Sequence, residues 1–549
     1  MTLSAFTRSL AAVASVSLIL AGAAAAQDQA QPAGQVVEAQ SLGALDLWSA
    51  PGRDTGLPAG LWHGASAGVV RETLDQIDGR PLSPALAALA RRVLATGANA
   101  PDGAGNDPVL ASLRVRALLA LGDASAAQAI QGRAADVESS EAQTRAKAET
   151  ALEYGRDSEA CDAAQALQQG RDAPFELKLR AYCSVLAGQP AAAQVTLDLW
   201  RQGGGKDAAF DRLATAASGG AVSKKKPLKA SLSDPLNYAL SRHLKLDLAL
   251  DDAAPEVAAA VANDPSASPA VRAEAAARAL RTGALSPESV RTIDALAAGG
   301  STATVADLAA KPGAEAEAAL SVLASQGADP NLAGQAAEAL LKRAKSPYDF
   351  IALSRLAAPG VALAVKAHAP VDDPVLFATA AAVAGDTDTA GALRGGIEQD
   401  KAPGSGPFEL AMLDAIMAVQ GGKPAGPVLD RLIERGGVGD AKLRARAQAA
   451  ALLLAALGEP ISDEARAQFA AFDTPAARTD AERALTLARA AVGHRQGEAA
   501  IVSVSIGLQQ GLGLTPADRA LIVGGLHAAG LNGEARAVAV EGLVVLARP

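Results

Sequence analysis

The sequence predicts an all-α protein, an elongated α-solenoid of stacked antiparallel helix pairs. Half of the 549 residues are hydrophobic but only 3% are aromatic, and alanine, the strongest helix former, carries most of the apolar share. Helix-like stretches alternate with glycine and proline breaks, and a glycine followed by a small residue recurs at a near-constant interval. This composition excludes a disordered chain and a mostly β protein.

Residues 1–26 have the pattern of a secretory signal peptide. Arg8 precedes an apolar stretch from Leu10 to Gly22, and three alanines then precede Gln27. Small residues before Gln27 suit cleavage by a signal peptidase, whereas an uncleaved membrane anchor is the alternative. No second membrane-spanning stretch follows. We expect export to the periplasm.

Residues 27–60 differ in composition from the rest of the chain. Residues 27–40 are polar and expected to be disordered, whereas Trp48 and Trp62 place two of the three tryptophans in one short region. Large apolar rings gain free energy when they are covered. We expect these tryptophans to cap the first helices, the alternative being an exposed docking site.

Residues 61–202 are predicted to be helical repeats. Gly122, Gly155 and Gly188 follow apolar helix ends at intervals of 33 residues, and each is followed five positions later by an alanine. Such a period holds two helices and two short turns. The glycine is expected to take the left-handed conformation that ends the first helix, and the alanine to let the next helix approach closely.

Residues 372–549 are expected to hold a second run of repeats. The intervals between its turn glycines are 35 to 37 residues. The glycines are Gly385, Gly421 or Gly422, Gly458, Gly493 and Gly530, and the small residues that follow them are Ala390, Ala425, Ala465, Ala499 and Ala535.

The glycine turns resemble those of the tetratricopeptide-repeat superfamily, in which Gly-x-x-x-x-Ala joins two helices. The match is direct from Gly122 to Ala127, Gly155 to Ala160, Gly188 to Ala193, Gly385 to Ala390 and Gly530 to Ala535. The large aromatic positions of that family are mostly absent here. The resemblance implies a right-handed solenoid and carries no catalytic residues.

The middle of the chain keeps helical stretches but loses the strict period. Residues 203–235, rich in glycine, serine and lysine, are expected to be a linker or loop. Residues 236–371 are expected to form irregular helix pairs. Asp234-Pro235, Ser268-Pro269 and Ser286-Pro287 each place a capping side chain before a proline, which is typical of a helix start.

A disulfide is expected between Cys161 and Cys183, the two cysteines of the chain. If residues 157–169 and 175–187 are antiparallel helices, both cysteines lie eleven positions from the mirror point at residue 172 and face one another. An oxidising compartment would favour the bond. Two cysteines cannot complete a thiolate-only zinc site, and no C-x-x-C pair is present.

No catalytic, cofactor or metal site is predicted. Gly64-Ala65-Ser66-Ala67-Gly68 fits the G-x-S-x-G pattern of serine hydrolases, but no β-strand pattern precedes it, and Ser66 is expected to cap a helix instead. The five histidines show no metal-binding spacing. They are His63, His243, His368, His494 and His527. Asp372-Asp373 and Asp386 with Asp388 are expected to be helix-cap and turn acids.

The net charge of −9 argues against nucleic acid as a partner. The single basic run, Lys224 to Lys226, is expected to be a solvated loop. Stacked helix pairs expose a long surface that suits an extended peptide or a folded protein. We therefore expect a non-catalytic scaffold that binds protein partners in the bacterial cell envelope, for envelope integrity or cell-wall assembly. The alternatives are a periplasmic accessory of the flagellar motor and a hydrolase acting on peptidoglycan or an ester.

Overall fold

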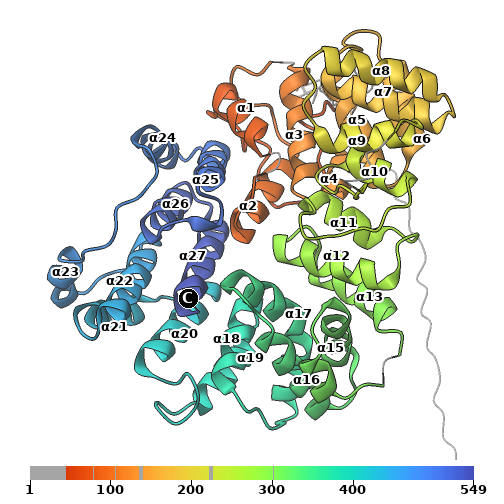
Figure 1. The fold of residues 1–549 in the computed structure, drawn as a ribbon. Coiled ribbons are helices and arrows are strands. Elements are labelled where there is room, and N and C mark those ends of the chain that lie inside the picture. Colours follow the sequence, from red (N-terminus) through yellow and green to blue (C-terminus); the bar gives the residue numbers. More distant parts are fainter. Residues whose placement is uncertain are drawn as a thin grey trace, which may run out of the picture. The chain divides into compact units, whose positions relative to one another are not determined.

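The computed structural model is all-helical and describes residues 45–77, 80–105, 107–134, 140–221, 227–300 and 302–548. Within these ranges the chain forms α-helices and one 3₁₀ turn, Gly511–Gly513, with no strand. Helices that follow one another along the chain mostly pack as pairs (Figure 1). The predicted all-α fold of stacked helix pairs is confirmed. The expected signal segment, residues 1–26, and the polar stretch 27–40 lie outside the described residues.

Proline begins thirteen of the described helices. Its fixed backbone angle suits the first helical position, where no N–H bond is lost. The three helix starts predicted in the middle of the chain are confirmed at Pro235, Pro269 and Pro287. Each preceding residue caps its helix through the side chain, as Asp234 does by accepting from the Asn237 N–H at 2.9 Å.

The N-terminal part of the described chain holds four helices and the segment before them. These helices are α1 (Ala67–Gln76), α2 (Pro84–Ala95), α3 (Pro108–Ala120) and α4 (Ala124–Arg133). Trp48 and Trp62 are 2% and 0% exposed and meet edge to face, with ring centroids 5.6 Å apart. The tryptophans are therefore core residues and do not form an exposed docking surface.

Arg114 of α3 binds the segment that precedes α1 through backbone carbonyl groups. Its guanidinium is fully buried and donates to the carbonyls of five residues. They are Leu47, Trp48, Ala50, Leu94 and Thr96, at 2.6–3.2 Å. All five N–H donors of an arginine can be used in this way, so a buried cation is compatible with the apolar core around it.

Six helices form a lobe with a hydrophobic core of its own. They are α5 (Glu141–Glu153), α6 (Asp157–Ala166), α7 (Pro174–Leu186), α8 (Pro190–Gln202), α9 (Ala208–Ala217) and α10 (Pro235–His243). The stretch 203–235, expected to be a linker, contains α9. The α9 side chains of Phe210, Leu213 and Ala214 are buried, which explains why this stretch folds.

Seven helices follow in the region expected to form irregular pairs. They are α11 (Pro255–Asn263), α12 (Pro269–Thr282), α13 (Pro287–Ala298), α14 (Val305–Ala310), α15 (Ala314–Gln326), α16 (Pro330–Lys342) and α17 (Pro347–Lys366). Among the described helices, α17 alone has the length and hydropathy of a membrane span, and more than half of its most apolar window is buried inside the fold.

The remaining ten helices complete the array. They are α18 (Pro374–Ala384), α19 (Thr387–Gly396), α20 (Pro407–Gln420), α21 (Gly426–Gly437), α22 (Ala441–Ala456), α23 (Asp463–Ala470), α24 (Ala481–Val492), α25 (Gln496–Gln510), α26 (Pro516–Ala528) and α27 (Asn532–Ala547). One continuous cluster of buried side chains runs from Leu47 to Val544 and reaches the lobe at Ala146 of α5 and Tyr238 of α10.

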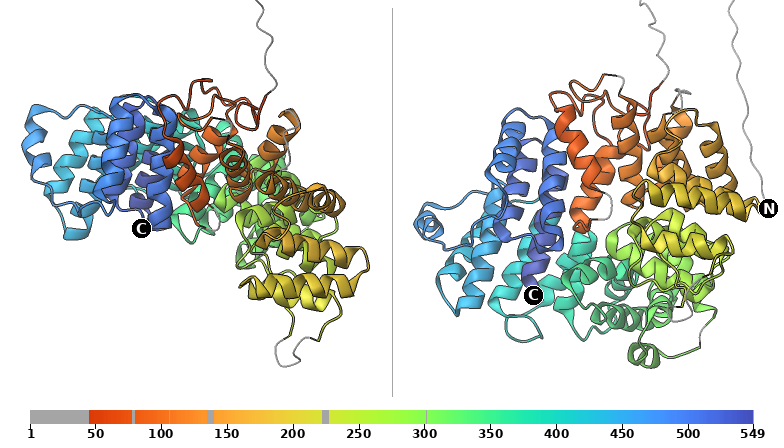
Figure 2. Two further views of the ribbon diagram at one scale, coloured as in Figure 1. Left: turned by 90° about the horizontal axis from the view of Figure 1, so that it is seen from above. Right: turned by 45° about the horizontal axis from the view of Figure 1, so that its top comes forward.

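The first and last helices of the array pack against each other, a contact that the expectation of an elongated solenoid did not include. Helices α1 and α2 contact α25, and α2 also contacts α27 (Figures 1 and 2). The Gly497 N–H of α25 donates to the Leu61 carbonyl at 3.0 Å. Arg495 donates to the Gly64 carbonyl at 3.1 Å, and Arg92 of α2 pairs with Glu534 of α27.

We call this contact between α1–α2 and α25–α27 the closure. A buried carboxylate contributes to it. The Glu541 side chain of α27 accepts from the Ala85 N–H of α2 at 2.8 Å and from Arg519 of α26 at 2.7 Å. Arg519 also donates to the Tyr348 hydroxyl of α17 at 2.7 Å. Both charged side chains are 3% exposed. Burial lowers the pKa of Arg519, but the carboxylate of Glu541 and the Tyr348 hydroxyl outweigh it and raise that pKa above its ordinary value.

The closure also depends on a close approach at Gly497. A Cβ atom at this position would lie 2.6 Å from the Trp62 ring and 2.7 Å from the Leu61 carbonyl oxygen. Real Cβ atoms do not approach other heavy atoms so closely. A glycine here allows α25 to lie directly on the N-terminal segment.

We predict that Glu541→Ala lowers the free energy of unfolding by about 3 kcal/mol, because Arg519 would stay buried without its partner. The double substitution Arg519→Met with Glu541→Leu should recover most of this loss, since it removes both charges and keeps apolar volume. Urea unfolding followed by circular dichroism measures both. Equal losses in the single and double variants would contradict this account of the closure.

We predict that Gly497→Ala lowers the free energy of unfolding by about 2 kcal/mol, because the added methyl group overpacks the contact with Trp62. The matched control is Gly533→Ala, where no heavy atom lies within 4 Å of the new Cβ. That control should be neutral or slightly stabilising. Thermal unfolding of the two variants compares them directly, and a neutral Gly497→Ala would refute the close approach.

Candidate functional site

The candidate site consists of two cavities that share one lining residue, Lys345, in the connection between α16 and α17. The first cavity has a volume of about 470 Å³ and is lined by the N-terminal turns of α17, α18 and α20, by α22 and by the end of α27. The second has a volume of about 650 Å³ and is lined by α12, the α14–α15 connection and the ends of α16 and α17. Lys345 lines both. We call them together the paired cavities.

Apolar side chains form much of the first cavity. They come from the facing sides of α18 and α20 and are Val375, Leu376, Phe408, Met412, Leu413 and Ile416. Its lining also includes three cations, Lys345, Arg446 and Arg548, and two acids, Asp373 and Glu409. A concave apolar surface with a few charged groups at its edge is the usual form of a ligand site.

The two arginines of the first cavity are held by aromatic rings and carbonyl groups. Arg446 of α22 lies 4.7 Å from the Phe408 ring centroid and donates to the carbonyls of Leu546 and Ala547 at 2.7 and 3.0 Å. Arg548 lies 4.0 Å from the Phe350 ring centroid. Burial lowers the pKa of Arg548, and the charge of Asp373 opposes this shift.

Charged side chains dominate the second cavity. Six are basic and four are acidic. Arg281 is neutralised by two of the acids, because it pairs with Glu317 at 2.9 Å and with Asp349 at 3.0 Å. Burial alone would lower the pKa of Arg281, but these two carboxylates raise it above its ordinary value.

Other arginines of the second cavity donate to carbonyl groups. Arg278 donates to the Ala253 carbonyl at 2.9 Å. Arg343 donates to three carbonyls near the end of α14, with distances of 3.0–3.2 Å. A carbonyl oxygen fixes a guanidinium in place but carries no full negative charge. These arginines, like Arg446 in the first cavity, are therefore held in position by carbonyl groups.

Over the paired cavities, eight basic and six acidic side chains form the lining when Lys345 is counted once. The difference of two is offset, because Lys311 pairs with Glu315 and Lys342 pairs with Glu338, two acids outside the lining. Asp373 is already engaged, because it caps α18 by accepting from the Leu376 N–H at 2.9 Å. The paired cavities are thus lined by charged groups of both signs that nearly balance.

The hydrolase-like pattern around Ser66 lies far from these cavities in the sequence and in a different structural setting. Ser66 precedes α1 as predicted, but its side chain forms no capping hydrogen bond. Its backbone instead pairs with Asp102 in an isolated parallel bridge. No strand leads into it, so the strand–turn–helix arrangement that a hydrolase elbow requires is not formed by the residues around Ser66.

Most of the predicted turn glycines take the left-handed conformation. Positive φ angles are found at Gly122, Gly155, Gly188, Gly385, Gly422, Gly458 and Gly530. Of the two alternatives Gly421 and Gly422, Gly422 makes the turn, whereas Gly421 has φ −78°. The expectation for Gly493 is wrong: Gly493 has φ −81°, and His494, with φ 50°, takes the left-handed position.

Two of the aspartates singled out in the sequence cap helices. Asp373 and Asp386 cap α18 and α19 as expected. No group of three or more histidine, cysteine, aspartate or glutamate side chains suited to a metal is found among the described residues. Lys224 to Lys226 lie outside the described residues.

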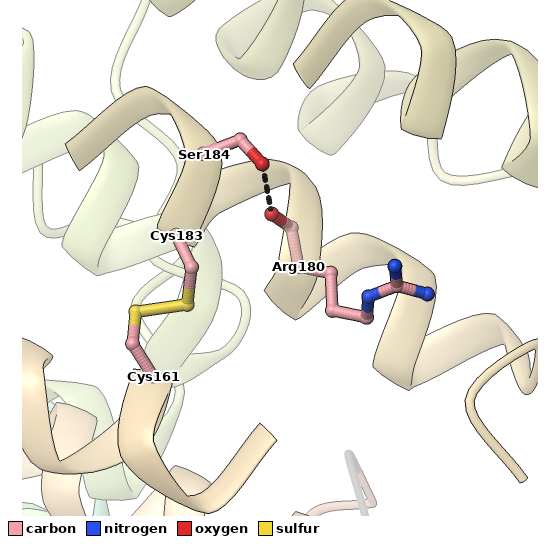
Figure 3. Close-up of a disulfide and its surroundings, with 4 residues drawn as sticks. All are labelled: Cys161, Arg180, Cys183 and Ser184. Carbon is pink, nitrogen blue, oxygen red and sulfur yellow. Dashed lines mark hydrogen bonds between the residues drawn. A yellow bond between two sulfur atoms is a disulfide. The ribbon is translucent and has the colours of Figure 1, made fainter. Parts of the chain in front are cut away.

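The two cysteines are bonded as the hairpin geometry predicts. Cys161 of α6 and Cys183 of α7 have an S–S distance of 2.02 Å and a Cα–Cα distance of 5.6 Å (Figure 3). Next to the bond, the Ser184 hydroxyl donates to the Arg180 carbonyl at 3.0 Å (Figure 3). The bond joins two helices of the lobe and lies outside the paired cavities.

Family models, curated proteins and solved structures were each compared with the chain, and none matches it. The tetratricopeptide resemblance therefore stays a prediction from the glycine turns.

No pattern in the sequence predicted the paired cavities. Their cations are spread from Arg278 to Arg548 and share no motif. One signal was present: three proline-started helices, at Pro347, Pro374 and Pro407, begin at the first cavity.

We predict that Cys161→Ser with Cys183→Ser destabilises the lobe by about 3 kcal/mol, because the disulfide restricts the unfolded chain. Hydrogen exchange followed by mass spectrometry should show faster exchange in α5–α10 and little change in α18–α27. Alkylation without reductant should leave the native protein unmodified. Two free thiols in protein purified from the periplasm would contradict the predicted bond.

Proposed function

We propose that the protein is a non-catalytic scaffold of the bacterial cell envelope that acts in the periplasm and binds protein partners through the paired cavities. The observation that carries this proposal is the concave surface of the paired cavities, which is lined by charged side chains of both signs and by apolar residues. Its arginines are fixed by carbonyls and rings, so binding would cost little ordering entropy.

Two further observations support a periplasmic location. The Cys161–Cys183 bond suits an oxidising compartment. The pattern of residues 1–26 is typical of an export signal. The kinship with tetratricopeptide-like arrays is part of the same proposal, supported by seven left-handed turn glycines at repeat positions.

A crosslinker placed in the paired cavities should capture the partner, whereas one placed elsewhere on the surface should not. Lys345 is exposed, lines both cavities and forms no ion pair with a described residue. We predict that the photo-crosslinker benzoylphenylalanine in place of Lys345 yields a reproducible protein adduct in periplasmic extract. Mass spectrometry then identifies the adduct.

The matched control places the same crosslinker at Lys366, an exposed lysine at the other end of α17. This helix has 20 residues, so the two sites lie roughly 30 Å apart. No protein adduct at position 345, or the same adducts at both positions, would count against the scaffold proposal. Loss of the adduct when excess unmodified protein is present during irradiation would show that the captured contact is specific.

A further inference from the structure

We propose that a proton on the Glu153 side chain keeps the lobe packed on α11, and that loss of this proton loosens the junction. Glu153 is the last residue of α5, a helix of the lobe that contacts both α3 and α11 (Figure 1). The lobe has its own core, and the larger cluster reaches its helices at Ala146 and Tyr238. A change of charge at this junction can therefore alter how the lobe packs. The proposal is independent of the partner and of the paired cavities.

The carboxyl group of Glu153 is buried and incompletely hydrogen-bonded. Glu153 is 8% exposed, and its Oε1 atom is buried with no hydrogen-bond partner among the described residues. An ionised carboxylate in this position is far more costly than a neutral carboxyl group, because water no longer solvates its charge. The surroundings of Glu153 therefore favour its protonated form.

Acidic side chains outnumber basic ones on one side of Glu153. A cavity of about 50 Å³ there is lined by five acids and two arginines. The acids come from α1, α5, α11 and the residue before α10, and are Asp75, Glu149, Glu153, Asp234 and Glu256. Arg116 of α3 and Arg145 of α5 both pair with Glu149, at 3.2 and 2.7 Å. Ionisation of Glu153 would add a negative charge where negative charges are already in excess.

The other side of Glu153 borders a cavity of about 450 Å³. Arg53, which lines this cavity, pairs with Asp123, and Arg91 donates to a backbone carbonyl at 3.0 Å. Tyr154 also lines it, and burial raises the pKa of this hydroxyl above its ordinary value, so it stays protonated near neutral pH. Helices α6 and α7, as far as the structure describes them, contribute no charged side chain to either lining.

These surroundings determine the sign of the pH effect. Burial raises the pKa of Glu153 well above its ordinary value of 4.5, and the charges of Glu256 and Glu149 raise it further. When the junction loosens, water reaches the carboxyl group and its pKa returns towards the ordinary value. The packed junction thus binds more protons than the loosened one, so its stability falls as the pH rises above 4.5. The loss is complete when the packed state also gives up its proton.

Hydrogen exchange of the full chain, followed by mass spectrometry between pH 5 and pH 8, tests the proposal. After correction for the intrinsic pH dependence of amide exchange, α11 should exchange about tenfold faster or more at pH 8, because each unit of pKa difference changes the equilibrium tenfold. Helices α20–α22 should keep their protection. The readout is taken at α11, outside the lobe, because burial also raises the pKa of Glu176 in α7, to about 7.

Three substitutions locate the effect. Glu153→Gln keeps the shape of the side chain and stays neutral, so the protection of α11 should become nearly independent of pH. Glu256→Gln removes one of the repelling charges and should reduce the pH effect without abolishing it. Glu159→Gln is the matched control, because it changes an exposed glutamate of α6 in the same lobe. It should leave the pH dependence as in the unmodified protein. Circular dichroism confirms that each variant is folded.

Two results would overturn the proposal. One is equal protection of α11 at pH 5 and pH 8 in the unmodified chain, even if exchange within α7 rises, because the pH effect would then lie inside the lobe. The other is the same pH dependence of α11 in Glu153→Gln and Glu159→Gln, which would assign the effect to another titrating group.

Discussion

The buried carboxylate of Glu541 is the interaction on which the arrangement of the whole array depends. It accepts hydrogen bonds from α2 and from Arg519, and Arg519 reaches Tyr348 of α17. Residues from the start, middle and end of the chain thus share one buried polar network. A network of this kind is stable only while every member is satisfied, because each unpaired group would be buried without a partner. The helices that surround the paired cavities are positioned by the same packing, since α17 and α27 contribute to both.

Much of the fold could be predicted from local sequence signals. The Asp234-Pro235, Ser268-Pro269 and Ser286-Pro287 pairs predicted helix starts because capping and proline act within one turn of the helix. The hairpin around residue 172 predicted the Cys161–Cys183 bond because two short helices and a tight turn leave little freedom. The shift from Gly493 to His494 shows the limit of such reasoning, since an exposed non-glycine residue can also take the left-handed conformation.

The closure and the candidate site could not be predicted because both depend on long-range packing. Ala85 and Glu541 are 456 residues apart in the chain, and no periodic pattern relates them. The turn glycines report how each helix pair forms, but the direction of the next pair depends on side chains that meet only after stacking. Nothing in the sequence distinguishes Arg278, Arg343 and Arg446 from ordinary surface cations. Their carbonyl partners identify them as fixed charges, and those partners become known once the helix ends are placed in space.

The joining of the first and last helices has a mechanical consequence. An open helical-repeat array bends and stretches like a spring, because each repeat contacts its neighbours alone and small rotations add up along the stack. Here α1 and α2 pack on α25, and α2 also packs on α27. A rotation between one pair of helices must therefore be compensated by rotations between other pairs, because the first and last helices stay in contact. Such an array resists gradual extension under load and holds its surfaces at fixed separations until the fastening itself breaks.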